Sequence, residues 1–558
     1  MQKIAELLRT PHIKILICAS LAINILALAL PVMTMQVYDR ILTNNAIDTL
    51  VVISTGVIIA AAFEFCLRLA RTKLLGYVGA HFEHEASVKA VENLLGTDPR
   101  NYERKSKIVL LQDVGSASRL KDYYGGQVAA TMLVDIPFAV LLLGLTFYLS
   151  WQIALVCSVI LAVFGYLSWK QGIKLKANMD EREEEDNKRY NFIIQILHSI
   201  HTVKALCLEA IMSRRFEEVQ RNNGLINYRM ASIQGSVSTL GYATAQFMTI
   251  AVICVATPIV VTGHITVGVL VACVMLSGQV MQPIQRGLGL WIRMQDINIA
   301  KERLGGLLEM PQRDVHSAEE MGQNHGAIKL DKVRFSYVEG QPVLDNASID
   351  IEPGEVVAIH GASGSGKTTL LELMAGIYQP DKGSITLSGM EPWKLDQSER
   401  ARYIAYLPSK GMILRGSIMD NLCGFDPKRQ PEVKKIIELL GIEEVVARLP
   451  AGYDTPLEGL TTDVIAPGLK QRLAIARALL FKPRLILYDN ADQGLDRESY
   501  ARVFGLLAKL KGKATLVIAS EDKNILSLAD KSIEVRRGRL VQMTEQSPIV
   551  AGFKKGGF

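Results

Sequence analysis

Residues 15–33 form an uninterrupted run without a charged side chain. At 1.5 Å per residue, a helix of this length approaches the roughly 30 Å thickness of the bilayer hydrocarbon. Further apolar runs follow at residues 50–69, 128–149, 153–169, 237–262 and 265–284, and none comparable appears after residue 295. Average globular proteins are already about 45–50% apolar, so the hydrophobic content of 49% does not by itself indicate a membrane protein. The placement of the apolar runs does. The sequence predicts six membrane spans in residues 1–300, a linker at 301–326, a soluble domain at 327–545 and a tail at 546–558.

The connections between these spans predict their orientation. The three short connections contain Arg40 as their only Lys or Arg, whereas the two long ones, about 70–127 and 170–236, are rich in both. By the positive-inside rule, the long loops, the N-terminus and the soluble domain are cytoplasmic. The acidic residues in 180–186 (DEREEED) argue against nucleic acid as a partner of these basic loops. The loops have few glycines or prolines, so we expect them to be helical.

The first run also permits a second interpretation. Lys3, Arg9 and Lys14 precede it and Ala-Leu-Ala occurs at 27–29, as in a cleaved signal peptide. The length of the run and the five later spans favour an inserted helix.

Two acidic residues fall inside predicted spans. Glu64 and Arg68 are four residues apart, which favours an ion pair on one helix face over an ion pathway. Asp135 precedes Pro137 in the third span. Intramembrane carboxylates are candidates for function, and both a helix or subunit contact and substrate binding stay open for Asp135.

The soluble part contains a phosphate-binding motif. Residues 361–369 read GASGSGKTT, after an apolar strand at 356–359 and before a helical run at 370–377. Glycines allow backbone N–H groups to approach phosphate, Lys367 neutralises the β and γ oxygens, and Thr368 can hold Mg²⁺. The motif therefore predicts a phosphate-binding site that can hold Mg²⁺.

The chain resembles an ABC exporter half-transporter, and within that superfamily the ABC component of bacterial type I protein secretion systems. The resemblance rests on the strings MQVYDRIL (35–42), LVDIPFAVLL (133–142), IHTVKAL (200–206) and GVLVACVMLSGQVMQPI (268–284). It implies an α-helical six-span exporter domain followed by an α/β P-loop ABC ATPase domain, in the bacterial inner membrane. It also implies a protein substrate, a periplasmic adaptor and an outer-membrane channel, besides membrane lipid. Relatives often carry a peptidase-like domain before the first span, and with some fourteen residues there we do not expect substrate docking by such a domain.

The resemblance also implies the residues that hold ATP. Tyr337 corresponds to the aromatic residue that stacks on adenine, and Asp489 to the Walker B aspartate that orders Mg²⁺ together with Thr368. The phosphate loop supplies the remaining contacts, which we expect from Gly361, Ser363, Gly364, Ser365, Gly366, Lys367, Thr368 and Thr369.

The residues that would cleave ATP depart from the family pattern. Asn490 stands in place of the catalytic glutamate, Ser520 in place of the switch histidine and Ser409 in place of the Q-loop glutamine. An amide cannot accept a proton from water, and loss of a general base commonly costs about 10²–10⁴-fold in rate. The signature that faces the partner's ATP reads IAPGL at 465–469, with Ala466 and Gly468 at its contact positions, and the D-loop reads QGLD at 493–496. Pro467 removes one N–H from that signature.

These substitutions lead to competing functions. The leading interpretation is the catalytically degenerate half of a heterodimeric exporter, which binds ATP and hydrolyses it weakly or not at all, beside a second ABC subunit. The weak point of this interpretation is that the partner's phosphate loop would face the altered signature. An alternative is a non-transporting regulatory or structural ATP-binding membrane subunit, in which nucleotide stabilises the assembly. An active homodimeric exporter is the third possibility.

Overall fold

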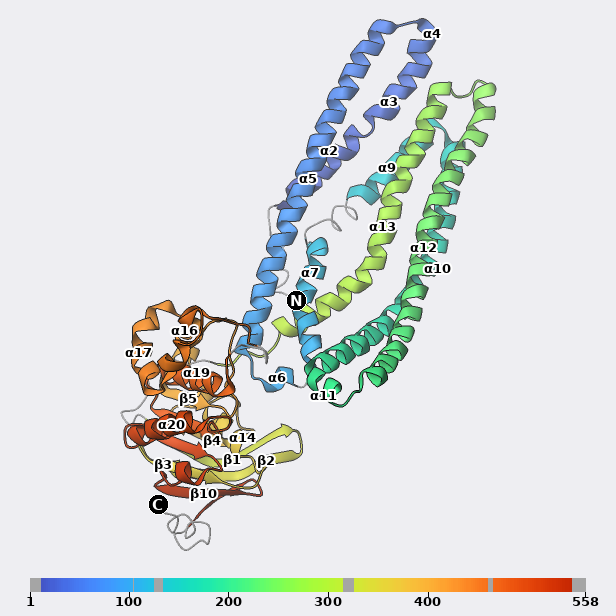
Figure 1. The fold of residues 1–558 in the computed structure, drawn as a ribbon. Coiled ribbons are helices and arrows are strands. Elements are labelled where there is room, and N and C mark those ends of the chain that lie inside the picture. Colours follow the sequence, from blue (N-terminus) through green and yellow to red (C-terminus); the bar gives the residue numbers. More distant parts are fainter. Residues whose placement is uncertain (1–11, 104, 125–133, 315–325, 460–464, 544–558) are drawn as a thin grey trace. The chain divides into compact units, whose positions relative to one another are not determined.

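The computed structural model describes residues 12–103, 105–124, 134–314, 326–459 and 465–543 (Figure 1). The start of the predicted third span (128–133), linker residues 315–325 and the predicted tail (546–558) lie outside this range. The chain divides into two compact units. The first comprises Met1–Leu95 and Glu103–Met310, and the second Gly96–Tyr102 and Pro311–Phe558.

The first unit is built from long helices. They are α2 (His12–Leu26), α3 (Ala29–Gln36), the π-helix η1 (Val37–Ile41), α4 (Leu42–Asn44), α5 (Ile47–Gly96), α7 (Lys107–Tyr124), α9 (Ile136–Leu149), α10 (Trp151–His198), α11 (Ile200–Ala205), α12 (Glu209–Val261) and α13 (Val267–Leu308). With 50 residues, α5 is about 75 Å long at 1.5 Å per residue, well beyond a bilayer. Most described residues of the two long loops are helical, in the continuations of α5, α10 and α12 and in α7 and α11 (Figure 1).

The number of membrane spans stays a prediction. Five helical segments of the described chain are long and apolar enough to cross a membrane: Ile15–Asn44, Ile47–Gly96, Trp151–Lys174, Glu209–Val261 and Val267–Gly287. The third predicted span coincides with the shorter apolar helix Ile136–Leu149, which follows undescribed residues. At the other end of the unit, α13 continues to Leu308, inside the region that the sequence suggests as a linker.

The motif MQVYDRIL has a structural role at the start of α13. Asp39, in η1, accepts hydrogen bonds from the hydroxyl of Thr266 at 2.7 Å and from the backbone N–H of Gly268 at 2.8 Å. A carboxylate at a helix N-terminus satisfies otherwise unpaired N–H groups and interacts favourably with the helix dipole. Asp39 therefore joins the first helices to the last one.

The second unit contains a mainly parallel sheet. Its strand order is β11 (Arg539–Gln542), β10 (Lys531–Arg536), β3 (Val356–His360), β9 (Thr515–Ala519), β8 (Leu485–Asp489) and β5 (Ile404–Leu407), in which β11 alone is antiparallel to its neighbour. A second, antiparallel sheet has the order β2 (Gln341–Ile351), β1 (Ile328–Val338) and β4 (Lys382–Leu387).

Alternation along the central strands divides the core into two layers. Val356 and Ala358 of β3 pack into one hydrophobic cluster, whereas Val357 and Ile359 pack into the other. Strands β8 and β9 alternate in the same way and are buried at every position. Because both faces of a parallel strand are covered, these strands read as continuous apolar runs.

Helices complete the second unit around this sheet (Figure 1). They are α6 (Arg100–Glu103, of which the last residue falls in the first unit), α14 (Lys367–Met374), α15 (Gln397–Tyr403), α16 (Ile418–Leu422), α17 (Gln430–Leu439), α18 (Ile442–Val446), α19 (Pro467–Leu479), α20 (Arg497–Leu510) and α21 (Lys523–Leu526).

A short segment from far upstream belongs to the second unit. The guanidinium of Arg100 lies 2.8 Å from Asp381 and 5.2 Å from the ring centroid of Phe335. Thr97 donates a hydrogen bond of 2.8 Å to the carbonyl of Pro311 and forms a β-bridge with Gln312. Residues 96–102 are thus held by side-chain and backbone contacts to β1, to the residue before β4 and to residues 311–312 of the second unit.

Candidate functional site

The phosphate loop connects β3 to α14 in the conformation that its glycines permit. Gly361, Gly364 and Gly366 have φ values of 150°, 78° and 103°, where a β-carbon is disfavoured. A β-carbon on Gly361 would lie 2.5 Å from the hydroxyl oxygen of Ser365. That Ser365 oxygen is buried and has no hydrogen-bond partner among the described residues. The loop thus places the Ser365 hydroxyl, which has no partner among the described residues, inside a tightly curved backbone, and this arrangement fits a phosphate ligand.

Lys367 is held against this loop. Its ammonium group donates to the carbonyls of Gly361 at 2.7 Å and Ala362 at 3.1 Å. Lys367 is also the first residue of α14, where the helix dipole favours an anion. The positive charge and the helix N-terminus therefore occur together at the predicted phosphate site.

Thr368 and Asp489 come together from separate elements. The hydroxyl of Thr368 donates to Asp489 Oδ1 at 3.2 Å, and the phenol of Tyr406 donates to Asp489 Oδ2 at 2.9 Å. Burial, together with the negative charge of Asp489, raises the pKa of Tyr406, so that its phenol stays protonated and acts as the donor. A hydroxyl and a carboxylate are hard oxygen ligands, which suit Mg²⁺. When bound, Mg²⁺ would neutralise phosphate charge beside these two residues.

The predicted catalytic positions share one edge of the sheet. Asp489 pairs with Ala519 in the register of β8 and β9, and Ile359 pairs with Ala519 in the register of β3 and β9. Asn490, Ser520 and the phosphate loop therefore all follow the carboxyl ends of adjacent parallel strands, where ligands of open α/β sheets bind. Ser409 follows β5 at the same edge, two residues beyond the end of the strand.

Asn490 has a left-handed backbone. Its φ is 46°, a conformation that asparagine tolerates better than most residues, and its N–H donates to the carbonyl of Ala519 at 2.8 Å. Its side-chain oxygen is buried and has no hydrogen-bond donor among the described residues. The amide can accept a hydrogen bond from water but cannot act as a general base.

Ser520 is turned toward Asp492. Its hydroxyl donates to Asp492 Oδ1 at 3.0 Å and accepts from the N–H of Asp522 at 3.0 Å. The side chain of Ser520 is only 5% exposed. A buried hydroxyl that already has a donor and an acceptor has little capacity left for a phosphate ligand.

The altered signature begins α19. Ala466 is the N-cap residue and Pro467 occupies the first helical turn, where a missing N–H is tolerated because it would have no partner within the helix. A methyl group at the N-cap cannot accept the hydrogen bond that a serine hydroxyl would accept. Position 468 lies beside the D-loop, since a β-carbon there would be 3.5 Å from the carbonyl of Gly494.

Tyr337 lies beside the helix that follows the phosphate loop. Its hydroxyl is 3.1 Å from Thr369 Oγ1 and donates to Glu372 at 3.2 Å. Its ring packs edge-on against Phe335 and Tyr378, with centroids 5.0 Å and 5.5 Å away. The ring is therefore fixed near the phosphate loop, and stacking on adenine stays a prediction, as do the roles of the other site residues toward ATP.

Two family models match the two halves of the chain. The model for the ABC transporter transmembrane region matches residues 13–284, and the model described as ABC transporter matches residues 344–493, which include the phosphate loop and Asp489. The chain belongs to the ABC transporters. Its membrane domain and ATP-binding domain are fused in one polypeptide.

Relatives of the transporter are secretion proteins. It is 28% identical to the cyclolysin secretion/processing ATP-binding protein CyaB of Bordetella pertussis, over 95% of this chain and 75% of the relative. It is 26% identical to the alpha-hemolysin translocation ATP-binding protein HlyB of Escherichia coli, also over 95% of this chain and 75% of the relative. These relatives bear out the predicted resemblance to ABC components of type I secretion systems.

A solved structure supports the predicted exporter architecture. The structure of a bacterial Atm1-family ABC exporter with ATP bound matches with a TM-score of 0.82 and 18% identity, over 97% of this chain and 98% of that one. The predicted fold class, a helical exporter domain followed by an ABC ATPase domain, is therefore confirmed. The transporter is an integral membrane protein related to type I secretion translocators.

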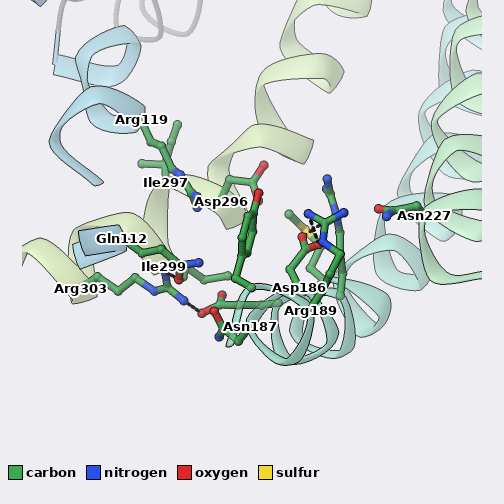
Figure 2. Close-up of a pocket in the computed structure, with 14 residues that line it drawn as sticks. Gln112, Arg119, Asp186, Asn187, Arg189, Asn227, Asp296, Ile297, Ile299 and Arg303 are labelled. Carbon is green, nitrogen blue, oxygen red and sulfur yellow. Dashed lines mark hydrogen bonds and ion pairs between the residues drawn. The ribbon is translucent and has the colours of Figure 1, made fainter. Parts of the chain in front are cut away.

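The first unit, which we call the membrane unit, contains a polar cavity of about 700 Å³ (Figure 2). It lies among α7, α10, α12 and α13. Arg303 of α13 donates to Gln112 of α7 at 3.0 Å and to Glu183 of α10. Asp186 of α10 accepts from Asn223 of α12 at 2.7 Å. Arg303 and Asp186 thus already have partners on neighbouring helices, and these contacts hold α7, α10, α12 and α13 together around the cavity.

Sequence reasoning missed Tyr406 and Asp492. Tyr406 lies three residues before Ser409, and Asp492 lies two residues after Asn490, so both are close to predicted catalytic positions. A carboxylate near two altered catalytic positions is a detectable signal for Asp492. Tyr406 offers no such signal, because an aromatic residue at the end of a buried strand is common in any core.

Proposed function

We propose that this transporter is the ATP-binding, catalytically degenerate half of a heterodimeric exporter for protein substrates. A second ABC subunit supplies the intact catalytic residues, and the assembly works with a periplasmic adaptor and an outer-membrane channel across the bacterial envelope. Its ATP-binding domain lies on the cytoplasmic side of the inner membrane and uses Mg²⁺.

The observation that carries this proposal is the hydrogen bond from Ser520 to Asp492. In an active site, the residue at this position would contact the γ-phosphate, whereas the Ser520 hydroxyl is buried and already bonded. Asn490 adds an amide where a base is needed, while the phosphate loop and the Thr368–Asp489 contact keep the groups that bind nucleotide. The arrangement favours a site that holds ATP over one that cleaves it.

The relatives support the substrate class. CyaB and HlyB are described as secretion or translocation proteins for cyclolysin and alpha-hemolysin, which are proteins. Asymmetry between two subunits follows from the altered residues, since a homodimer of this chain would combine two sites that both lack a base.

The test begins with the full chain purified alone. It should bind ATP in a fluorescent-nucleotide titration with Mg²⁺ and turn it over very slowly. Lys367→Ala should abolish binding, because it removes the ammonium group at the phosphate loop. The matched control Lys382→Ala, on β4, should bind ATP normally. Brisk hydrolysis by the isolated chain would contradict the degenerate site.

Partners are identified by affinity purification from native membranes. A complete ABC subunit in near-equal amount supports the heterodimer. In the reconstituted pair, replacing the partner's catalytic glutamate should stop export, whereas Asn490→Gln should change it little. Self-association alone, with export unaffected by deletion of this chain, would instead favour the non-transporting ATP-binding subunit.

A further inference from the structure

A second cavity of the membrane unit, about 340 Å³ in volume, combines an apolar wall with a charged end. Helices α2, α3, α5, α9 and α13 contribute to it. Its apolar wall includes Ile23, Leu26, Leu30, Val57, Phe138 and Leu142. Its charged end contains Arg68, Arg71 and Arg286 with Glu64 and Asp135. Three arginines face two carboxylates, so the lining has one excess positive charge.

Asp135 leaves one acceptor unused at the charged end. Its side chain is only 3% exposed, and Oδ1 accepts from the amide of Asn24 at 3.3 Å. Oδ2 has no hydrogen-bond donor among the residues that the structure describes. The nearest cation, Arg71, lies 3.6 Å away, which is an ion-pair distance beyond that of a hydrogen bond. A buried carboxylate oxygen without a donor is costly, so this atom points to a ligand that offers one.

The three arginines differ in how many of their N–H groups already contact protein acceptors. Arg68 is committed to Glu64, with contacts of 2.6 Å and 2.7 Å, which confirms the predicted ion pair on α5. Among the described residues, Arg71 has the 3.6 Å contact with Asp135 as its single ion pair, and its side chain is 15% exposed. Arg286 makes one long hydrogen bond of 3.4 Å to Gln282. Arg71 and Arg286 therefore keep N–H donors for an anion.

The charged end lies at the boundary of the apolar part of α5. Residues 49–63 carry no charge, and Glu64 opens the charged part of the helix, which continues to Gly96. With the orientation predicted from the loops, this boundary is the cytoplasmic surface of the bilayer. An amphipathic ligand would place its polar group there and its hydrocarbon along the apolar wall.

We propose that this cavity binds a phospholipid of the cytoplasmic leaflet whose head group carries both a phosphate and a hydrogen-bond donor. The phosphate accepts from Arg71 and Arg286, the donor reaches Asp135 Oδ2, and an acyl chain covers the apolar wall. Phosphatidylethanolamine offers an ammonium donor and phosphatidylglycerol a hydroxyl. Phosphatidylcholine has the same phosphate and chains but no donor, so the site should discriminate against it.

Native mass spectrometry of the full-length chain, with any co-purifying subunit, tests this proposal. The detergent-solubilised protein is mixed with equal amounts of the three lipids carrying identical acyl chains. Because a hydrogen bond to a charged group is strong, we expect phosphatidylethanolamine and phosphatidylglycerol to be retained about tenfold more than phosphatidylcholine. Asp135→Ala should abolish this preference, and Arg286→Gln should lower retention of all three lipids.

Arg286→Gln and one control variant make the test decisive. Arg286 is exposed, so Arg286→Gln reports on binding even if Asp135→Ala misfolds. Lys73→Gln removes a nearby cation on α5 that does not line the cavity and should change nothing. Equal retention of phosphatidylcholine by the unmodified protein, with no effect of Arg286→Gln, would overturn the proposal. Displacement of the lipids by a stoichiometric acidic peptide would overturn it as well and would assign the cavity to exported polypeptide.

Discussion

The hydroxyl of Ser520 donates a hydrogen bond of 3.0 Å to Asp492, three residues beyond Asp489, the predicted Walker B aspartate. This bond joins the loop after β9 to the loop after β8, at the edge of the sheet where ATP is expected. The conformation of each loop therefore depends on the other.

Asp492→Ala should destabilise the ATP-binding unit without changing its affinity for ATP. Loss of one partly buried hydrogen bond costs about 1 kcal/mol, which thermal unfolding of the full chain should detect. Gln493→Ala, at an exposed neighbouring position, is the control and should unfold like the parent. If Asp492→Ala removed residual ATP turnover while the protein stayed folded, Asp492 would have a catalytic role that we do not assign to it.

Asn490→Glu should fail to restore hydrolysis on its own. The glutamate would have to adopt the left-handed backbone conformation of residue 490, at a cost of about 1 kcal/mol. Ser520 and the altered signature would also remain. Steady-state ATPase assays of the purified chain should therefore show little change. An increase of about 100-fold or more would mean that the missing base was the single defect of the site.

Tyr406→Phe should weaken the Mg²⁺-dependent part of ATP binding. The phenol fixes Asp489 Oδ2 at 2.9 Å, and a hydrogen bond to a carboxylate can be worth about tenfold in an equilibrium constant. ATP titrations with Mg²⁺ and with a chelator separate the two contributions. Tyr453→Phe, which lies outside the site, is the matched control. Identical Mg²⁺ dependence of Tyr406→Phe and the parent would exclude a positioning role for Tyr406.

Ala466→Ser should stabilise the ATP-binding unit. A hydroxyl at the N-cap of α19 can accept from the first helical turn and adds about 1 kcal/mol. For a unit of this size we expect the melting temperature to rise by about 2–4 °C. Ala501→Ser, at an exposed interior position of α20, should give no such rise. A lower melting temperature for Ala466→Ser would show that the hydroxyl does not fit this cap.

The stability of the ATP-binding unit should fall as the pH decreases through the range in which histidine titrates. Burial lowers the pKa of His360 below its ordinary value of 6.5, Glu534 acts in the opposite direction and Lys367 adds to the effect of burial. The unfolded chain therefore binds a proton more readily than the folded chain. The stabilisation is fully present above pH 6.5 and is lost progressively below it. Melting temperatures measured from pH 7.5 to 5.5 should fall less for His360→Gln than for the parent, and parallel curves would contradict this origin.

Local patterns predicted much of the fold. The uncharged run at 15–33 predicted a spanning helix, and GASGSGKTT predicted the strand, loop and helix that β3, Gly361 and α14 form. Such features depend on hydrophobic periodicity and backbone conformation within one segment, and both can be inferred from the local residue pattern. The helical continuation of the spans was predicted for the same reason.

Contacts between distant residues could not be predicted in this way. The bond from Tyr406 to Asp489, the ion pair of Arg71 with Asp135 and the assignment of residues 96–102 to the second unit all join segments that lie far apart in the chain. They depend on strand order and helix packing, for which one sequence contains no local signal. Asp135 shows this best, since its position suggested either a helix contact or a ligand site, and its two oxygens differ in what they contact.

The contacts of residues 96–102 have a practical consequence for anyone who dissects this protein. A recombinant fragment that starts near residue 326 would lack Arg100, and with it the cation that covers Phe335 and pairs with Asp381. Phe335 in turn packs against Tyr337, the residue expected to stack on adenine. Nucleotide affinities measured on such a fragment would thus describe a domain that lacks these contacts next to the residue expected to recognise the base. A synthetic peptide covering 96–102 and supplied in trans is a simple way to restore them.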